Sequence, residues 1–154
     1  MDITESEKFE NKICMFFEKA RLETFKTWIY DEHSNCNPKK LAEAGFYYNG
    51  TAEEPDAVQC FYCDKALDGW DKDDDPWMEH INHSKTCNFA VAKQPENNLT
   101  FNQLIDFYSA FMYKNMKQVL DTSLTKYNAE RSAKVTKLKK SVNLLKNIKL
   151  LKLY

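Results

Sequence analysis

The chain of 154 residues has few residues that break helices, because it contains only three glycines and four prolines. None of these lies in residues 96–154. Glycine and proline are the two residue types that most destabilise a helix interior. Their scarcity excludes a collagen-like chain and disfavours disorder. It also leaves residues 96–154 able to form one long helix.

The sequence also has no run of about eighteen apolar residues, so we expect no membrane span. Residues Met1 to Glu10 are polar and acidic without an apolar stretch, so we expect no secretory signal. In a reducing compartment, cysteines are used for metal binding more often than for disulfides. Of the five cysteines, Cys14 and Cys36 are expected to be buried thiols.

Acidic residues are absent after Glu130. Residues 1–100 contain 11 Lys or Arg and 20 Asp or Glu, whereas residues 101–154 contain 11 and 3. An acidic front half attracts basic partners such as cationic peptide tails. The basic, apolar rear half suits acidic helices, nucleic acid or an anionic membrane surface.

Four residues form a metal-binding pattern: Cys60, Cys63, Cys87 and a histidine between them. Three thiolates and one imidazole are a donor set that Zn²⁺ takes in closed, tetrahedral structural sites. Such a site leaves no position for a reactive water, so the pattern indicates one structural zinc in a binding module. On an ideal helix His83 lies one turn before Cys87 and His80 two turns before it, and spacing alone does not choose between them.

Residues before Gln94 indicate short elements separated by turns. Asn37-Pro38 and Asp75-Pro76 each resemble a helix N-cap followed by proline at the first helical position. The sequence therefore predicts a small mixed module, in which zinc contributes much of the stability. The expected elements are helical turns within 16–25, a helix over 38–44, strands over 46–48 and 58–61, and a helix from Pro76 that carries His80.

After Pro95, Thr100 and Gln103 resemble a capping box, and apolar residues then recur at three- and four-residue steps. A helix of this length would run roughly 80–90 Å, too long to pack on the preceding module. Its apolar stripe is therefore expected to contact another chain. The alternative is a helical hairpin broken near residues 121–123. The expected partner-helix face comprises Phe101, Leu104, Ile105, Tyr108, Phe111, Met112 and Val119.

In order and spacing, several segments resemble a baculovirus IAP repeat (BIR) domain. The match covers about residues 16–92. It implies an α+β fold, with a zinc-binding BIR domain of short helices and a short three-stranded sheet, followed by a long C-terminal α-helix. It also implies that His80 is the zinc ligand and His83 a groove residue. The implied segments are an N-terminal segment over 1–15, the BIR domain over 16–93 and the helix over 94–154. The matching segments are residues 21–28, 41–47, 56–63, 67–76, 79–80 and 87–89.

BIR domains bind the free N-terminus of a peptide that begins with alanine, and the resemblance assigns this groove to particular residues. Asp74 matches the carboxylate that holds the ammonium group. Leu67 and Trp70 match the walls around the alanine side chain. Trp77 is expected to be more buried than Trp70, or to lie at a contact.

Members with a single BIR domain and a long helix read a histone tail that begins Ala-Arg-Thr, with the threonine phosphorylated. Asp68 matches the carboxylate that pairs with the arginine. Lys65 and His83 match the phosphate contacts, as a doubly charged anion requires. Glu54 is expected to add a contact to the peptide.

The resemblance implies a non-enzymatic adaptor of the chromosomal passenger complex, acting in mitosis and cytokinesis. Its helix would bundle with helices of the inner centromere protein and borealin, and so target Aurora B kinase. The expected locations are the nucleus and cytoplasm, the centromere and kinetochore, and later the spindle midzone and midbody.

The alternative is an inhibitor of apoptosis that binds caspases or pro-apoptotic N-terminal peptides. A ubiquitin ligase is disfavoured because no Cys or His follows Cys87 to build a RING. A homodimer is also possible, because Ile13 to Phe17 and residues 89–99 resemble a self-association region. A core role fits them equally. A fragment ending at Asn98 is expected to fold without the helix.

Overall fold

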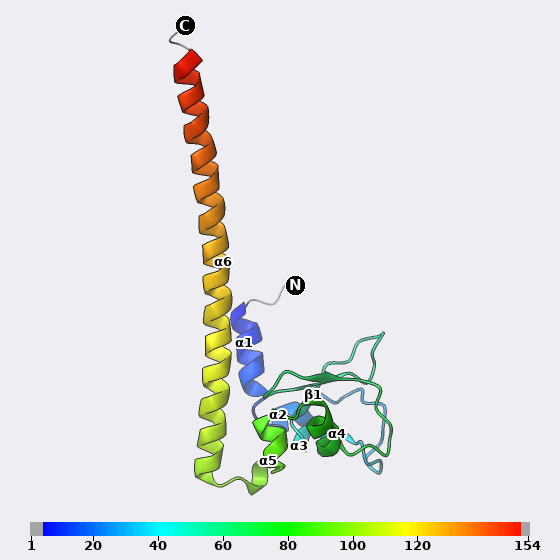
Figure 1. Ribbon diagram of the computed structural model, residues 1–154. Coiled ribbons are helices and arrows are strands. Elements are labelled where there is room, and N and C mark those ends of the chain that lie inside the picture. Colours follow the sequence, from blue (N-terminus) through cyan, green and yellow to red (C-terminus); the bar gives the residue numbers. More distant parts are fainter. Residues whose placement is uncertain (1–4, 152–154) are drawn as a thin grey trace. The chain divides into compact units, whose positions relative to one another are not determined.

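The computed structural model describes the backbone of residues 5–151 and the side chains of residues 7–145. Residues 1–4 and 152–154, the ends of the predicted first and last segments, lie outside the described residues. The chain divides into two compact units, the first ending at Met112 and the second beginning at Tyr113. The elements (Figure 1) are α1 (Glu5–Cys14), α2 (Glu18–Leu22), α3 (Pro38–Glu43), β1 (Phe46–Tyr48), β2 (Val58–Cys60), β3 (Ala66–Leu67), α4 (Pro76–His83), α5 (Asn88–Ala92), the 3₁₀ turn η1 (Glu96–Asn98) and α6 (Phe101–Leu151).

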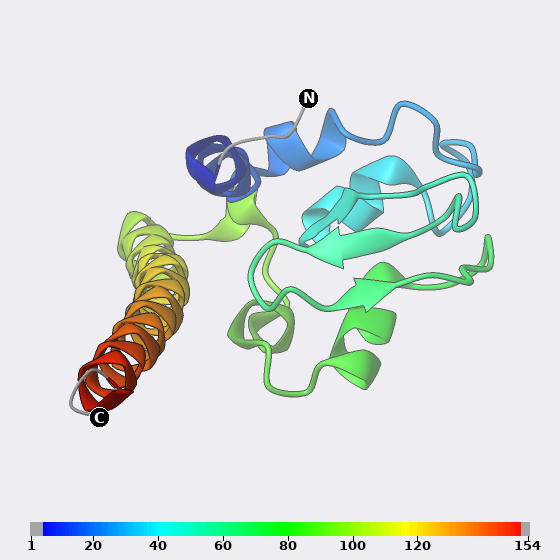
Figure 2. The same ribbon diagram turned by 90° about the horizontal axis from the view of Figure 1, so that it is seen from above.

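The three strands form one antiparallel sheet in the order β1-β2-β3, which confirms the expected three-stranded sheet. Phe46 pairs with Cys60, and Val58 pairs with Leu67. The helices α2 and α3 pack together beside β1, while α4 contacts α3 and α5 (Figure 2). The central strand thus ends at a predicted metal ligand.

Both predicted proline-started helices form where their caps indicate. The Asn37 side chain accepts a hydrogen bond from the backbone N–H of Lys40 at the start of α3. The Asp75 carboxylate accepts bonds from the N–H groups of Trp77 and Met78 at the start of α4. Each cap satisfies donors that the helix itself leaves unpaired.

A buried arginine, which the sequence pattern does not reveal, joins the helices of the first unit. The Arg21 side chain is fully buried and donates hydrogen bonds to the carbonyl oxygens of Ala42, Met15 and Phe16 at 2.9, 3.0 and 2.6 Å. Its guanidinium carbon lies 4.5 Å from the centre of the Phe61 ring. Burial lowers the pKa of Arg21 to about 10, against the opposing effect of nearby acidic groups.

The first turns of α6 belong to the core of the first unit, which corrects part of the predicted partner-helix face. Phe111 is fully buried, and its ring centre lies 5.5 Å from that of Phe16 and 5.7 Å from that of Phe61. Partly buried residues pack on the same core, whereas Phe101, Ile105 and Val119 are exposed. The partly buried residues are Leu104, Phe107, Tyr108 and Met112.

The compact unit extends beyond the predicted end of the BIR domain near residue 93, because it continues to Met112. A fragment ending at Asn98 would lack Phe111 and the apolar residues that pack with it. The folding of such a fragment stays a prediction, and we expect the loss of these contacts to lower its stability. The sequence did not reveal these contacts because a helix that supplies core residues has the same apolar periodicity as one that binds a partner.

Helix α6 runs without a break over the described residues 101–151, so the hairpin interpretation is wrong for that part of the chain. The hydroxyls of Thr122 and Thr125 donate to the carbonyl oxygens of Gln118 and Asp121, four residues earlier. These polar residues are thereby accommodated within the helix. No helix in the described part of the chain is long and apolar enough to cross a membrane.

The expectations for the thiols and the N-terminal residues were partly right. Cys36 is buried and its pKa is raised to about 12 by burial, but Cys14 is exposed. Phe16 is a core residue whose ring centre lies 5.0 Å from that of Tyr108, while Phe17 remains 48% exposed. The helix α1, which contains Cys14, was not predicted.

Candidate metal centre and adjoining pocket

Four side chains from different segments of the first unit converge on one point. Cys60 ends β2, Cys63 lies in the following turn, His80 lies in α4 and Cys87 directly precedes α5. Their potential ligand atoms all lie within 4.8 Å of one another. Cys60, His80 and Cys87 are buried, and Cys63 is partly exposed. The fold thus assembles the donor set that the spacing predicts.

The orientation of the imidazole resolves the choice between the two histidines. Nδ1 of His80 donates a hydrogen bond of 2.8 Å to the carbonyl oxygen of Ala44. A carbonyl only accepts, so Nδ1 carries a proton, and Nε2 faces Cys63 Sγ at 3.5 Å, where it would bind a metal in its deprotonated form. Backbone contacts of this kind orient metal-binding histidines. His80 is therefore the ligand, and His83 is not part of the cluster.

Backbone N–H groups and a hydroxyl surround the sulfurs of the Cys60–Cys63 turn. The N–H groups of Tyr62 and Cys63 point to Cys60 Sγ at 3.3 and 3.4 Å, and Ser84 Oγ lies 3.4 Å from Cys63 Sγ. Asp64 leaves the turn with a positive φ of 66°. These donors stabilise negative charge on sulfur, which is the form that binds metal.

The electrostatics of the cluster favour a bound cation. Burial raises the pKa of Cys60, whereas hydrogen bonds from the Cys60 and Cys87 thiols lower the pKa of Cys63. Burial alone would lower the pKa of His80, but the contacts with Cys63 and Cys87 outweigh it and raise the pKa to about 9. Thiols crowded in this way cannot all ionise together unless a cation neutralises them.

The donor set and its spacing fit Zn²⁺. Tetrahedral Zn–S bonds of about 2.3 Å place neighbouring ligand atoms about 3.8 Å apart, within the range seen in this cluster. Cys60, Cys63, His80 and Cys87 would hold the ion and use all four of its positions. Such an ion would join β2, α4 and the start of α5, and its role would be structural.

An open pocket of about 110 Å³ includes His83, which follows His80 by three residues in α4. It combines an apolar wall with three carboxylates and one imidazole. Leu67 supplies part of the wall from β3, and Glu79 and His83 come from α4. The lining residues are Leu67, Asp68, Gly69, Trp70, Asp74, Glu79 and His83. A small cationic or N-terminal group is the kind of ligand that such a lining favours.

Hydrogen bonds hold the acidic side of the pocket in place. Oδ2 of Asp74 accepts a bond of 2.8 Å from the N–H of Asp71, and Glu79 Oε2 lies 3.4 Å from His83 Nε2. The N–H of Trp70 donates to Asp56 at 2.8 Å. The chain leading into α4 is thereby fixed, and the Asp74 carboxylate is kept in the lining.

Comparison with known proteins identifies the family. A model of the BIR, described as the Inhibitor of Apoptosis domain, matches residues 21–91. Baculoviral IAP repeat-containing protein 5.1 of Xenopus tropicalis is 37% identical over 123 residues, which cover 80% of this chain and 76% of that protein. The chain belongs to the BIR family.

Other similar BIR proteins are of the same survivin type. Protein 5.2-B of Xenopus laevis is 35% identical over 72% of this chain and 71% of its own length. Protein 5 of Rattus norvegicus is 42% identical over 59% of this chain and 64% of its own length. These relatives confirm the predicted resemblance to a survivin-type BIR protein.

Not all residues predicted for the BIR groove line the pocket. Leu67, Asp68, Trp70, Asp74 and His83 do, whereas Glu54 and Lys65 do not. Glu54 is exposed in the loop before β2, and Lys65 directly precedes β3, where its carbonyl oxygen accepts a bond from the N–H of Cys60.

Glu79 is a lining residue that the sequence reasoning missed. It lies four residues before His83 in a helix whose start was predicted, and this spacing places the two side chains on one face. The burial order of the tryptophans was also wrong. Trp70 is only 6% exposed, while Trp77 is partly buried and stacks on Phe89 with ring centres 5.5 Å apart.

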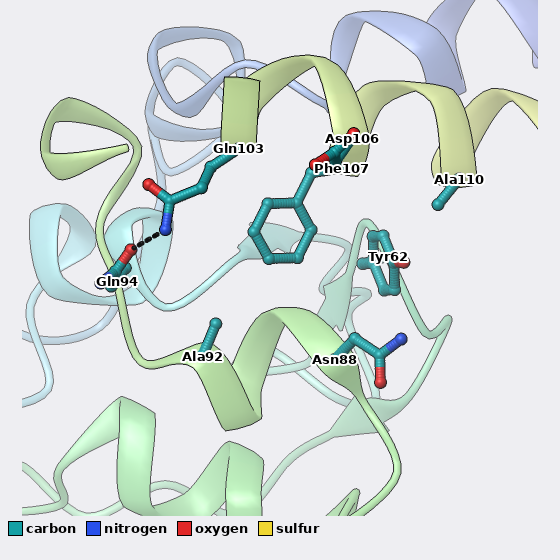
Figure 3. A pocket seen from close by; sticks show the side chains of 8 residues that line it. All are labelled: Tyr62, Asn88, Ala92, Gln94, Gln103, Asp106, Phe107 and Ala110. Carbon is teal, nitrogen blue, oxygen red and sulfur yellow. Dashed lines mark hydrogen bonds between the residues drawn. The ribbon is translucent and has the colours of Figure 1, made fainter. Parts of the chain in front are cut away.

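A second open pocket of about 490 Å³ lies between α5 and the start of α6 (Figure 3). The rings of Tyr62 and Phe107 form its walls, with their centres 6.1 Å apart. Gln103 Nε2 donates a bond of 3.4 Å to Gln94 Oε1 at its rim. No residue predicted for peptide binding lines this pocket.

Proposed function

We propose that this chain is a non-enzymatic adaptor that reads a histone tail and joins it to the chromosomal passenger complex. The BIR domain would bind a tail that begins Ala-Arg-Thr with the threonine phosphorylated. Helix α6 would bundle with helices of the inner centromere protein and borealin. The adaptor would place Aurora B kinase at the centromere and kinetochore, and later at the spindle midzone and midbody.

The observation that carries this proposal is the pocket in which carboxylates, an apolar wall and an imidazole meet. Asp74 and Glu79 offer two carboxylates to an N-terminal ammonium, and Leu67 with Trp70 offers a surface for one methyl group. His83 lies in the same lining, where it would bind the phosphate on the third residue of the peptide. A charge-assisted bond to phosphate contributes about 1.5–3 kcal/mol.

Two neighbouring features support the same ligand. Asp68 is an exposed carboxylate in the lining and would pair with the arginine at the second position. Lys65 lies two residues before Leu67 and would provide a further positive charge near the phosphate. The acidic character of residues 1–100 suits a basic tail.

The full chain should be titrated by calorimetry with the phosphorylated Ala-Arg-Thr peptide and its unmodified form. We expect the phosphorylated peptide to bind about tenfold more tightly, in line with one charge-assisted bond. Equal affinities would contradict the phosphate-reading part of the proposal. Replacing His83 by Ala should remove most of the difference.

The ammonium-binding role is tested by Asp74→Asn, which keeps an oxygen that can accept the bond from Asp71. This variant should lose binding of both peptides and retain zinc. Asp73→Ala is the matched control, because Asp73 is exposed and does not line the pocket. Unchanged affinity for Asp74→Asn would remove Asp74 from the binding site.

A second candidate function is inhibition of apoptosis, which the description of the matching family model favours. The same carboxylates would hold the ammonium of a caspase-derived or pro-apoptotic peptide that begins with Ala. A pro-apoptotic peptide titrated beside the histone peptides decides between the two. Tighter binding of that peptide would favour the inhibitor.

A further inference from the structure

Most of the exposed large apolar residues of the second unit recur on α6 with a period of eleven residues, and Val119, Leu144 and Leu145 lie outside this pattern. From Tyr113 onward the steps are three, four and four, and the pattern repeats to Val142. Eight of these positions are apolar and between 42% and 71% exposed, and Arg131 occupies the ninth. We call these nine positions the α6 stripe: Tyr113, Met116, Leu120, Leu124, Tyr127, Arg131, Val135, Leu138 and Val142.

This period determines the geometry of any helix that packs along the α6 stripe. Eleven residues over three turns correspond to about 3.67 residues per turn, slightly more than the 3.6 of a straight helix. The stripe therefore stays on one side of a nearly straight helix. A seven-residue repeat would instead wind around α6 in a left-handed supercoil.

The residues that border the α6 stripe are basic or neutral. One border consists of Lys117, Asn128 and Lys139, and the other contains Ser123 and Lys134. Neither border contains a carboxylate. A second copy of this chain would place lysines against lysines, whereas an acidic helix would meet opposite charges. The complementary occupant is therefore an acidic helix.

Arg131 interrupts the apolar series between Tyr127 and Val135. A charge enclosed by an apolar interface is costly unless an opposite charge pairs with it. A polar residue at such a position also selects the alignment of the two helices. A partner with a carboxylate at the matching height would pair with Arg131, and other alignments would leave the arginine unpaired.

We propose that the α6 stripe binds an acidic helix whose own apolar residues recur every eleven residues, with a carboxylate opposite Arg131. This inference rests on the helix-bundling part of the proposed function and specifies the partner's pattern and alignment. The bound helix would lie nearly parallel to the axis of α6, and the pair would be almost straight or would form a slight right-handed supercoil.

The test uses the full chain and two synthetic acidic helical peptides of equal length and equal composition, each as long as three eleven-residue repeats. One carries apolar residues at positions one, four and eight of every eleven, and the other at positions one and four of every seven. We expect the first to bind about tenfold more tightly, and the binding to weaken at high salt. Equal binding, or tighter binding of the second, overturns the proposal.

Two matched variants test the surface. Leu124→Glu places a charge in the α6 stripe and should abolish peptide binding, while Ala133→Glu makes the same change on the opposite side of the helix and should not. For Arg131→Glu, affinity should fall and should return when the facing carboxylate of the peptide is replaced by lysine. Failure of this exchange to restore binding removes Arg131 from the proposal.

Sedimentation of the chain alone tests the other occupant. If the chain alone forms a dimer and Leu124→Glu dissociates that dimer, a second copy covers the α6 stripe. This result would overturn the proposal. Co-purification with helices of the inner centromere protein and borealin distinguishes a failure of the eleven-residue inference from a failure of the proposed function. If these helices bind but the peptides show no preference, only the eleven-residue inference fails. If only the eleven-residue peptide binds, the named partners of the proposed function fail.

Discussion

The two compact units differ in where their apolar side chains find contacts. In the first unit, rings such as those of Phe61 and Phe111 are buried among one another and among residues from several elements. In the second, every described side chain from Met116 to Leu145 is exposed, including those of Leu120 and Leu138. Apolar residues at helical spacing thus pack into a core in the first unit, whereas in the second unit they form an exposed surface.

The metal centre should produce the largest difference between the units. Cys87→Ala should unfold the first unit, because structural zinc in small domains contributes on the order of 10 kcal/mol to folding. Residues 113–145 do not depend on the ion and should exchange their amide hydrogens at an unchanged rate. Hydrogen exchange with mass spectrometry, together with the zinc content, measures both units at once.

Cys14→Ala is the control for that experiment, because Cys14 is an exposed thiol outside the cluster. It should retain one zinc per chain and the wild-type exchange pattern. A folded first unit without zinc would show that the metal is not the main source of its stability.

A buried and an exposed position on the same helix provide the second test. Phe111→Ala should lower the free energy of unfolding by about 3–5 kcal/mol, as expected for removing a fully buried ring. Leu120→Ala, at a position that is 66% exposed, should change it by less than about 0.5 kcal/mol. Urea unfolding followed by tryptophan fluorescence compares the two, and similar losses would contradict the division of α6.

The smallest effect concerns the packing around the cluster. Gly45 has a φ of +91°, and an added Cβ would lie 2.7 Å from Phe89 Cε1. Gly45→Ala should therefore cost about 2–3 kcal/mol, combining backbone strain and overpacking. Gly69→Ala shares the positive φ of 76° but meets no atom within 4 Å, so it should cost only about 1–2 kcal/mol. Equal losses in thermal unfolding would show that Phe89 yields to the methyl group.

The features that could be predicted from the sequence depend on neighbouring residues. The caps at Asn37 and Asp75 act within three residues, and the Cys60–Cys63 turn brings two sulfurs together by itself. Cys87 and a histidine could be assigned to the same centre because metal chemistry restricts the donor types, but only the family resemblance selected His80 over His83. The family resemblance then placed most of the pocket residues, since the motif includes the loop that leads into α4.

The features that could not be predicted depend on how distant elements pack. Arginine is a residue type that usually lies at the protein surface. The burial of Arg21 is possible only because carbonyl groups of other segments accept its hydrogen bonds. The burial order of Trp70 and Trp77 depends on which ring faces the sheet and which stacks on Phe89. The role of Phe111 was missed because helical periodicity shows that a face is apolar without showing what covers it.

Helix α6 supplies Phe111 to a core and, nine residues later, Leu120 to an open surface, without a joint between them. Under the proposed function, a helix bound to the exposed part of α6 would be connected to the core of the first unit through the continuous helical backbone of residues 101–151. A protease or an engineered truncation that leaves the first unit complete would have to cut beyond Met112. A cut at the earlier change in composition near Pro95 would remove the buried Phe111 from that unit.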